Sequence, residues 1–113
     1  MNMSRDVYQK TIETFSLTSR LLKLAEEASE LSAATIRFMS GHDRKSISKI
    51  KSEFIEELAD VQIMIDQMKC IYGDEIEKKI KEKLIRLETL IEKEELRNLK
   101  RQENQNKENQ NDN

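Results

Sequence analysis

Apolar side chains recur along most of this chain at spacings of three and four residues, a pattern typical of helices that each bury one face. A first helix is predicted over about 5–15, where the stripe is Tyr8, Ile12 and Phe15. A bend at 16–19 follows, with Thr18 or Ser19 as the expected cap of a second helix over about 20–39. The inward positions of this second helix are Leu21, Leu24, Ala28, Leu31, Thr35 and Phe38.

The second half of the chain is divided by two glycines. Gly41 suits the left-handed position that ends a helix, and a third helix is predicted from Ser46 or Ser48 to Tyr72. Gly73 is expected to stop it, and Asp74 to cap a fourth helix with the stripe Ile76, Ile80, Leu84, Leu87 and Ile91. The prediction is an all-α, four-helix, bundle-like domain over 1–100. Residues 101–113 form a low-complexity polar tail that we expect to be disordered.

Two short acidic clusters stand out because their residues fall on the same helix faces as the apolar stripes. Glu27 and Glu30 lie three residues apart in the second predicted helix, and Glu57 and Asp60 repeat that spacing in the third. Residues three apart are neighbours on one helix face, so each pair can direct its oxygens toward one point. Unpaired carboxylates that turn inward cost several kcal/mol each, and clustered ones also repel. A cation makes such a cluster tolerable, and Mg²⁺ is favoured because hard cations prefer oxygen ligands.

Composition limits the remaining possibilities. The 113 residues suffice for one domain, and the absence of proline favours helix throughout. Charged residues make up 37% of the chain but nearly cancel to −2, which argues against a basic face for nucleic acid. Because the hydrophobic content is modest, a monomer can bury only a small core, and self-association would help to stabilise it.

Single residues add little chemistry. Cys70, the only cysteine, is interpreted as a packed and unreactive thiol, and His42, the only histidine, as a solvated loop residue. The N-terminus lacks the apolar run of a signal peptide, and no stretch is apolar for the roughly 20 residues that span a bilayer. A cytoplasmic location is therefore expected.

The acidic clusters resemble the signature of the MazG-like, all-α nucleoside triphosphate pyrophosphohydrolases. That signature is E-E-x-x-E on one helix and E-x-x-D on a later one, which correspond here to 26–30 and 57–60. The similarity covers about 5–95 and is closest to the small single-domain members of Gram-positive bacteria and their phages. It implies Mg²⁺-dependent hydrolysis of a nucleoside triphosphate between the α and β phosphates, giving a monophosphate and pyrophosphate, by a homodimer or homotetramer.

The resemblance also implies roles for individual residues. Glu27, Glu30, Glu57 and Asp60 would ligate Mg²⁺. Glu26, or one of the ligands such as Glu27, would take a proton from the attacking water, and the choice between them stays open. Lys83 and Arg86 resemble basic residues that occur late in the family, and they either contact phosphates or form part of a solvated face.

Two points leave the substrate and the function open. Small members often carry glutamine where this chain has Arg20, so Arg20 would bind phosphate or the base pocket would differ. The aromatic residues available for stacking on a base (Tyr8, Phe15, Phe38 and Tyr72) are more commonly used in packing. The alternative function is a non-catalytic helical dimerisation or interaction protein that retains a vestigial acidic groove.

Overall fold

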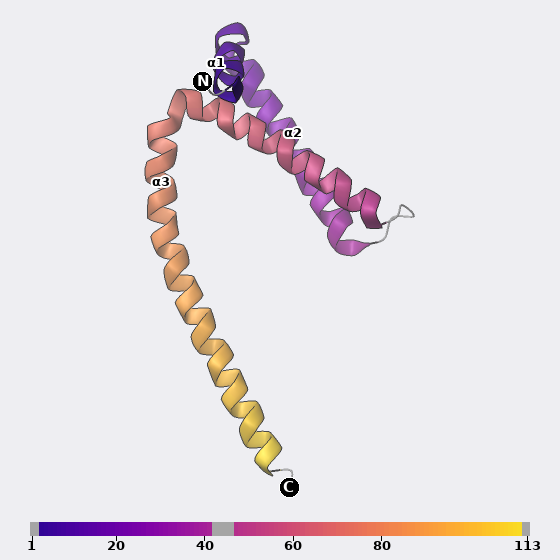
Figure 1. Cartoon of the computed structure of the whole chain (residues 1–113), viewed down its shortest axis with the longest axis vertical. Helices are drawn as coiled ribbons and strands as arrows, with labels where there is room; N and C mark the ends of the chain where they lie inside the picture. The colour runs from indigo at the N-terminus through magenta and orange to yellow at the C-terminus, as the bar shows by residue number, and fades with distance from the viewer. Residues whose placement is uncertain (1–2, 42–46, 112–113) are drawn as a thin grey trace. The chain divides into compact units, whose positions relative to one another are not determined.

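The structure is a computed structural model that describes residues 3–41 and 47–111. Within these ranges the chain forms three helices, α1 (Met3–Thr14), α2 (Leu17–Ser40) and α3 (Ile47–Asn111), and no strand (Figure 1). The predicted all-α class is confirmed. His42 and Ser46, two residues singled out in the sequence, lie outside the described residues.

Both ends of α2 are capped by short-range hydrogen bonds. Ser16 has extended backbone angles, and its Oγ accepts a bond of 3.1 Å from the backbone N–H of Ser19. The cap is therefore Ser16 and not Thr18 or Ser19 as predicted, because Ser16 already supplies the acceptor one turn before Ser19. At the other end Gly41 is left-handed, with φ 59°, and its N–H donates to the carbonyl of Arg37. That part of the prediction is confirmed.

α3 covers the two segments that were predicted as separate helices. Its one residue with non-helical angles is Tyr72, at φ −119° and ψ 21°, which produces a kink directly before Gly73. The predicted stop is thus present as a kink inside α3, and four separate helices are not found in the described ranges. The physical reason is that Gly73 does not adopt the left-handed conformation that would turn the chain away.

The expected disordered tail is helical as far as it is described. Residues 101–111 form the last turns of α3. Low complexity and polarity favour disorder, but arginine, glutamine, glutamate and lysine also have good helix propensity. No glycine or proline interrupts the helix between 74 and 111, so it can propagate without a breaker.

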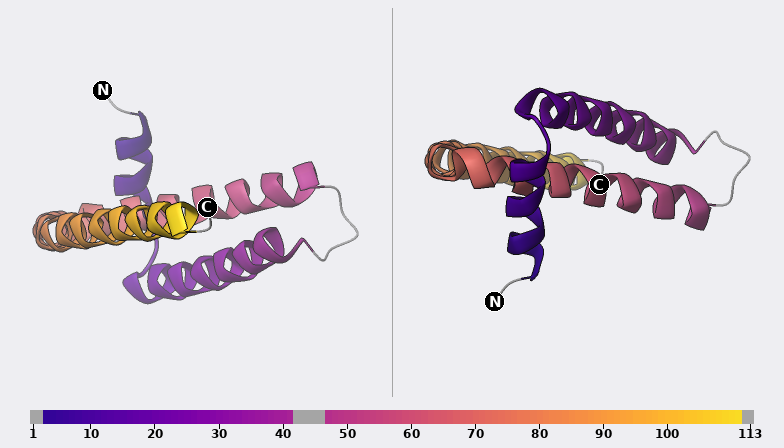
Figure 2. Two further views of the ribbon diagram at one scale, coloured as in Figure 1. Left: turned by 90° about the horizontal axis from the view of Figure 1, so that it is seen from below. Right: turned by 90° about the horizontal axis from the view of Figure 1, so that it is seen from above.

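The chain divides into two compact units, Met1–Gly73 and Asp74–Asn113. In the first unit α2 and the first part of α3 lie side by side and antiparallel (Figure 2), and the rings of Phe38 and Phe54 stack between them with centroids 5.1 Å apart. The buried apolar residues of this unit are Ala34, Ile50, Met64 and Met68.

This core leaves large apolar side chains on the surface. On α2 the exposed fractions are 68% for Leu22, 63% for Ile36 and 79% for Met39. In the second unit every described residue from 77 to 111 is exposed. None of the helices in the described ranges has a stretch long and apolar enough to cross a membrane.

Candidate metal site

An acidic cluster lies between α2 and α3 in the first unit. One carboxylate oxygen from each of Glu27, Glu57 and Asp60 lies within 4.8 Å of the other two. Glu57 and Asp60 share a face of α3 because they are one helical turn apart, and Glu27 comes from the facing side of α2. The pairing of α2 with α3 thus brings together three of the four carboxylates that the resemblance implies as ligands.

Glu27 is the buried member of the cluster, with only 7% of its surface exposed. Its Oε1 accepts from Nζ of Lys23 at 3.0 Å, while its Oε2 is buried and has no hydrogen-bond partner among the described residues. Oε2 of half-buried Glu57 is in the same state. Buried polar atoms without partners are uncommon in folded proteins, and one recognised explanation is an ion that would bind them.

Glu30 borders the cluster without contributing to the three-oxygen group. The pKa of its carboxyl is raised above the usual value, first by the negative charge of Glu27 and then by partial loss of solvent. The charges of Glu57 and Glu26 add to this rise. Glu30 therefore lies in the negative field of the cluster, as expected for a residue on the same helix face as Glu27.

The cluster has a cation that the sequence analysis overlooked. Lys23 reaches Glu27 at 3.0 Å and Glu26 at 3.6 Å. Its pKa is raised, chiefly by the hydrogen bond to Glu27 and then by the charges of Glu26 and Glu27. The signal was available, because lysine three and four residues before two glutamates is a standard ion-pair spacing on a helix.

The other residues with predicted roles lie outside the three-oxygen group. Glu26 is exposed, next to Lys23. Lys83 and Arg86 are exposed residues of the second unit, whereas the acidic cluster belongs to the first. The guanidinium carbon of Arg20 lies 4.3 Å above the ring centre of Phe15, and its Nη2 donates to Ser19 Oγ. Arg20 and Phe15 are thus in contact with each other.

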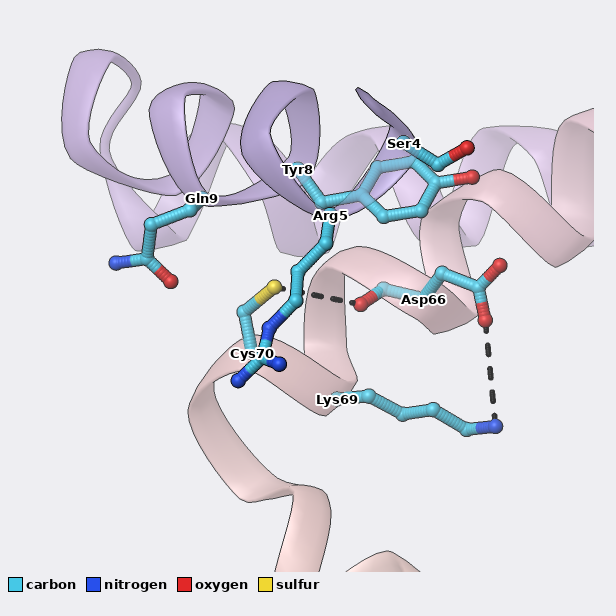
Figure 3. Close-up of a pocket in the computed structure, with 7 residues that line it drawn as sticks. All are labelled: Ser4, Arg5, Tyr8, Gln9, Asp66, Lys69 and Cys70. Atoms are coloured by element: carbon cyan, nitrogen blue, oxygen red, sulfur yellow. Dashed lines mark hydrogen bonds and ion pairs between the residues drawn. The ribbon is translucent and has the colours of Figure 1, made fainter. Parts of the chain in front are cut away.

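A separate pocket of about 570 Å³ lies between α1 and α3 (Figure 3). It is lined by Ser4, Arg5, Tyr8, Gln9, Asp66, Lys69 and Cys70. Nζ of Lys69 is 4.0 Å from Asp66 Oδ1, and the Cys70 thiol is 3.6 Å from the Asp66 carbonyl oxygen. Cys70 is half-buried at the edge of this pocket. The pocket shares no residue with the acidic cluster. The size of the pocket therefore does not identify the candidate metal site.

Comparison of the chain with models of known protein families finds no match, and none is found among curated proteins or among solved structures. The carboxylate geometry and the motif resemblance therefore carry the functional argument.

Proposed function

We propose that this chain is a Mg²⁺-dependent nucleoside triphosphate pyrophosphohydrolase, which cleaves the substrate between its α and β phosphates. The observation that carries the proposal is the convergence of Glu27, Glu57 and Asp60 on one point, with a buried and unpartnered oxygen on each of the two glutamates. The order and spacing of the acidic motifs, which resemble the MazG-like signature, support the choice of reaction.

The three carboxylates suit a small hard cation. Two ligands on opposite sides of Mg²⁺ are separated by about 4.2 Å, given metal–oxygen distances of about 2.1 Å. Adjacent ligands of octahedral Mg²⁺ are about 3.0 Å apart, and the observed oxygens lie within 4.8 Å of one another, so a shift of about 1 Å by each oxygen would gather them. Bound Mg²⁺ would supply positive charge to be shared by carboxylate and phosphate oxygens, and Lewis acidity toward water.

The protein residues have distinct tasks in this proposal. Glu27, Glu57 and Asp60 would hold the cation, and the α2–α3 pairing buries Glu27 and partly buries Glu57. Glu26 is exposed on the same turn of α2, where it can accept a proton from water that approaches the substrate. Lys23 neutralises part of the charge on Glu27 before metal binds.

The test is product analysis with the purified full-length protein, a panel of ribo- and deoxyribonucleoside triphosphates, and Mg²⁺. Cleavage between the α and β phosphates releases pyrophosphate and a monophosphate, whereas cleavage between β and γ releases orthophosphate. We expect pyrophosphate from the wild type, little from Glu57→Gln, and near wild-type release from the adjacent control Glu56→Gln. A folded wild type that releases no pyrophosphate across the panel would overturn the proposal.

A second candidate is a non-catalytic helical interaction protein. The exposed apolar residues of α2, among them Leu22 and Ile36, favour it because an interaction protein would bury such side chains against its partner. Under this reading wild type and Glu57→Gln would be equally inactive on every nucleotide while both stay folded.

A further inference from the structure

The second unit is a helical segment whose apolar side chains are mostly exposed in the described structure. At about 100° per residue, one stripe collects six of them on a single face: Ile76, Ile80, Leu84, Leu87, Leu90 and Ile91. Ile76 is half-buried and the other five are exposed. From Ile80 to Ile91 the spacing is four, three and four, which is the alternation of a two-stranded coiled coil.

The charges beside this stripe are sorted by sign between 76 and 97. The positions that directly flank the stripe on one edge carry the basic residues Lys83 and Arg97, whereas Lys79, Arg86 and Lys93 lie further out toward solvent. The flanking positions of the opposite edge carry the acidic residues Glu88 and Glu95 and one basic residue, Lys81. A helix that only needs to be soluble has no reason to separate its charges in this way, since alternating signs would serve equally well.

The sorted edges decide which partner fits. When two copies pair in parallel, the symmetry axis runs along the helices and the basic edge of each copy meets the acidic edge of the other. When two copies pair antiparallel, each edge meets itself, and the edge with Lys83 and Arg97 faces the same edge of the other copy. Charges beside the apolar seam set orientation and partner choice in coiled coils. We infer that the segment 76–91 is a self-association surface that pairs in parallel with the same segment of a second copy.

The seam has a defined end. The positions that continue it after Ile91 are Glu94 and Asn98, which are polar. Glu94 pairs with Arg97 of its own helix at 3.3 Å, so its charge has a local partner. The apolar contact is therefore confined to about four turns, and the pairing is expected to depend on salt because charge sorting specifies it.

Disulfide trapping tests the orientation in the full chain. In a Cys70→Ser background, Glu94→Cys places one thiol on the seam, next to its counterpart only in a parallel pair. Glu82→Cys is the matched control, because Glu82 lies on the far side of the helix. We expect Glu94→Cys to cross-link at least about tenfold faster than Glu82→Cys under mild oxidation. Equal rates, or no cross-linked dimer from either variant, would overturn the inference.

Charge reversal provides a second test that leaves the acidic cluster untouched. One variant makes the basic edge acidic (Lys83→Glu, Arg97→Glu), and the other makes the acidic edge basic (Glu88→Lys, Glu95→Lys). Each charge-reversed variant alone should have a dimer dissociation constant about tenfold or more above that of the wild type in analytical ultracentrifugation. An equimolar mixture of the two variants should restore dimers. Circular dichroism checks that helicity is kept. If each variant alone still dimerised as tightly as the wild type, the self-association surface would lie elsewhere, for example on α2, and the inference would be refuted.

Discussion

The replacement of Glu57 by glutamine should stabilise the metal-free protein and remove most of the stabilisation that Mg²⁺ gives to the wild type. Two unit charges 4.8 Å apart repel by about 0.9 kcal/mol in bulk water and by about 3.5 kcal/mol at an effective dielectric constant of 20. Glutamine keeps the shape of Glu57 and removes two of the three repulsive pairs in the cluster. Because Asp60 is exposed and Lys23 offsets part of the charge on Glu27, the smaller figure is the better guide.

The metal-free variant should accordingly be more stable than the wild type by about 1–2 kcal/mol. With Mg²⁺ the difference should shrink to near zero, since a site with a dissociation constant of about 1 mM stabilises the folded wild type by about 1.4 kcal/mol at about 10 mM Mg²⁺. Glu57→Gln should lose most of this gain. If the repulsion is real and the cation relieves it, both effects must occur together.

Urea unfolding followed by circular dichroism measures both quantities, once in EDTA and once in Mg²⁺ at matched ionic strength. Glu56→Gln is the control, because it removes one charge from an exposed neighbouring position outside the three-oxygen group. The reasoning fails if Glu57→Gln is less stable than the wild type in EDTA. It also fails if Mg²⁺ stabilises wild type and Glu57→Gln equally.

Three further predictions concern the neighbours of the cluster and the core. Lys23→Gln removes the ammonium that competes for Glu27, so isothermal titration calorimetry should show Mg²⁺ binding tightened by about threefold or more, and unchanged or weaker binding would contradict this. The pKa of Glu30 is raised on folding, so its contribution to stability is fully present below its unfolded pKa and is lost as pH rises through the folded value. Metal-free Glu30→Gln should therefore show a flatter dependence of the unfolding free energy on pH, measured by urea unfolding between about pH 4 and 7. An unchanged pH profile would refute this prediction. Met64→Ala should lower the free energy of unfolding by about 2–4 kcal/mol, because Met64 is 3% exposed in a core of few side chains, and a loss below about 1 kcal/mol would show that this site collapses.

The sequence was sufficient for the helical class and for the carboxylates on α3. Helix follows from local propensity and from apolar spacing, and Glu57 and Asp60 meet because residues three apart share a helix face. Gly41 ends α2 as predicted, since few other residues accept a left-handed conformation there. These features depend on residues within one turn of each other, so no long-range information was needed.

The boundary at 72–74 and the helix over 101–111 were not predictable in the same way. Gly73 can stop a helix or merely weaken it, and the chain kinks at Tyr72 without forming a loop. Polar residues such as glutamine and lysine are compatible with both helix and disorder. In each case two outcomes differ by little local free energy, so propensity alone does not choose between them.

Only the tertiary structure decided which acids meet and what surrounds them. From the sequence, Glu27 and Glu30 were equally good candidates for the cluster. The pairing of α2 with α3 brings Glu27 to Glu57 and Asp60 and leaves Glu30 at the border. Burial of the unpartnered oxygens likewise depends on how two distant helices pack. Local sequence determines the direction in which a side chain leaves its own helix, whereas the distance to a group about thirty residues away is determined by packing between helices.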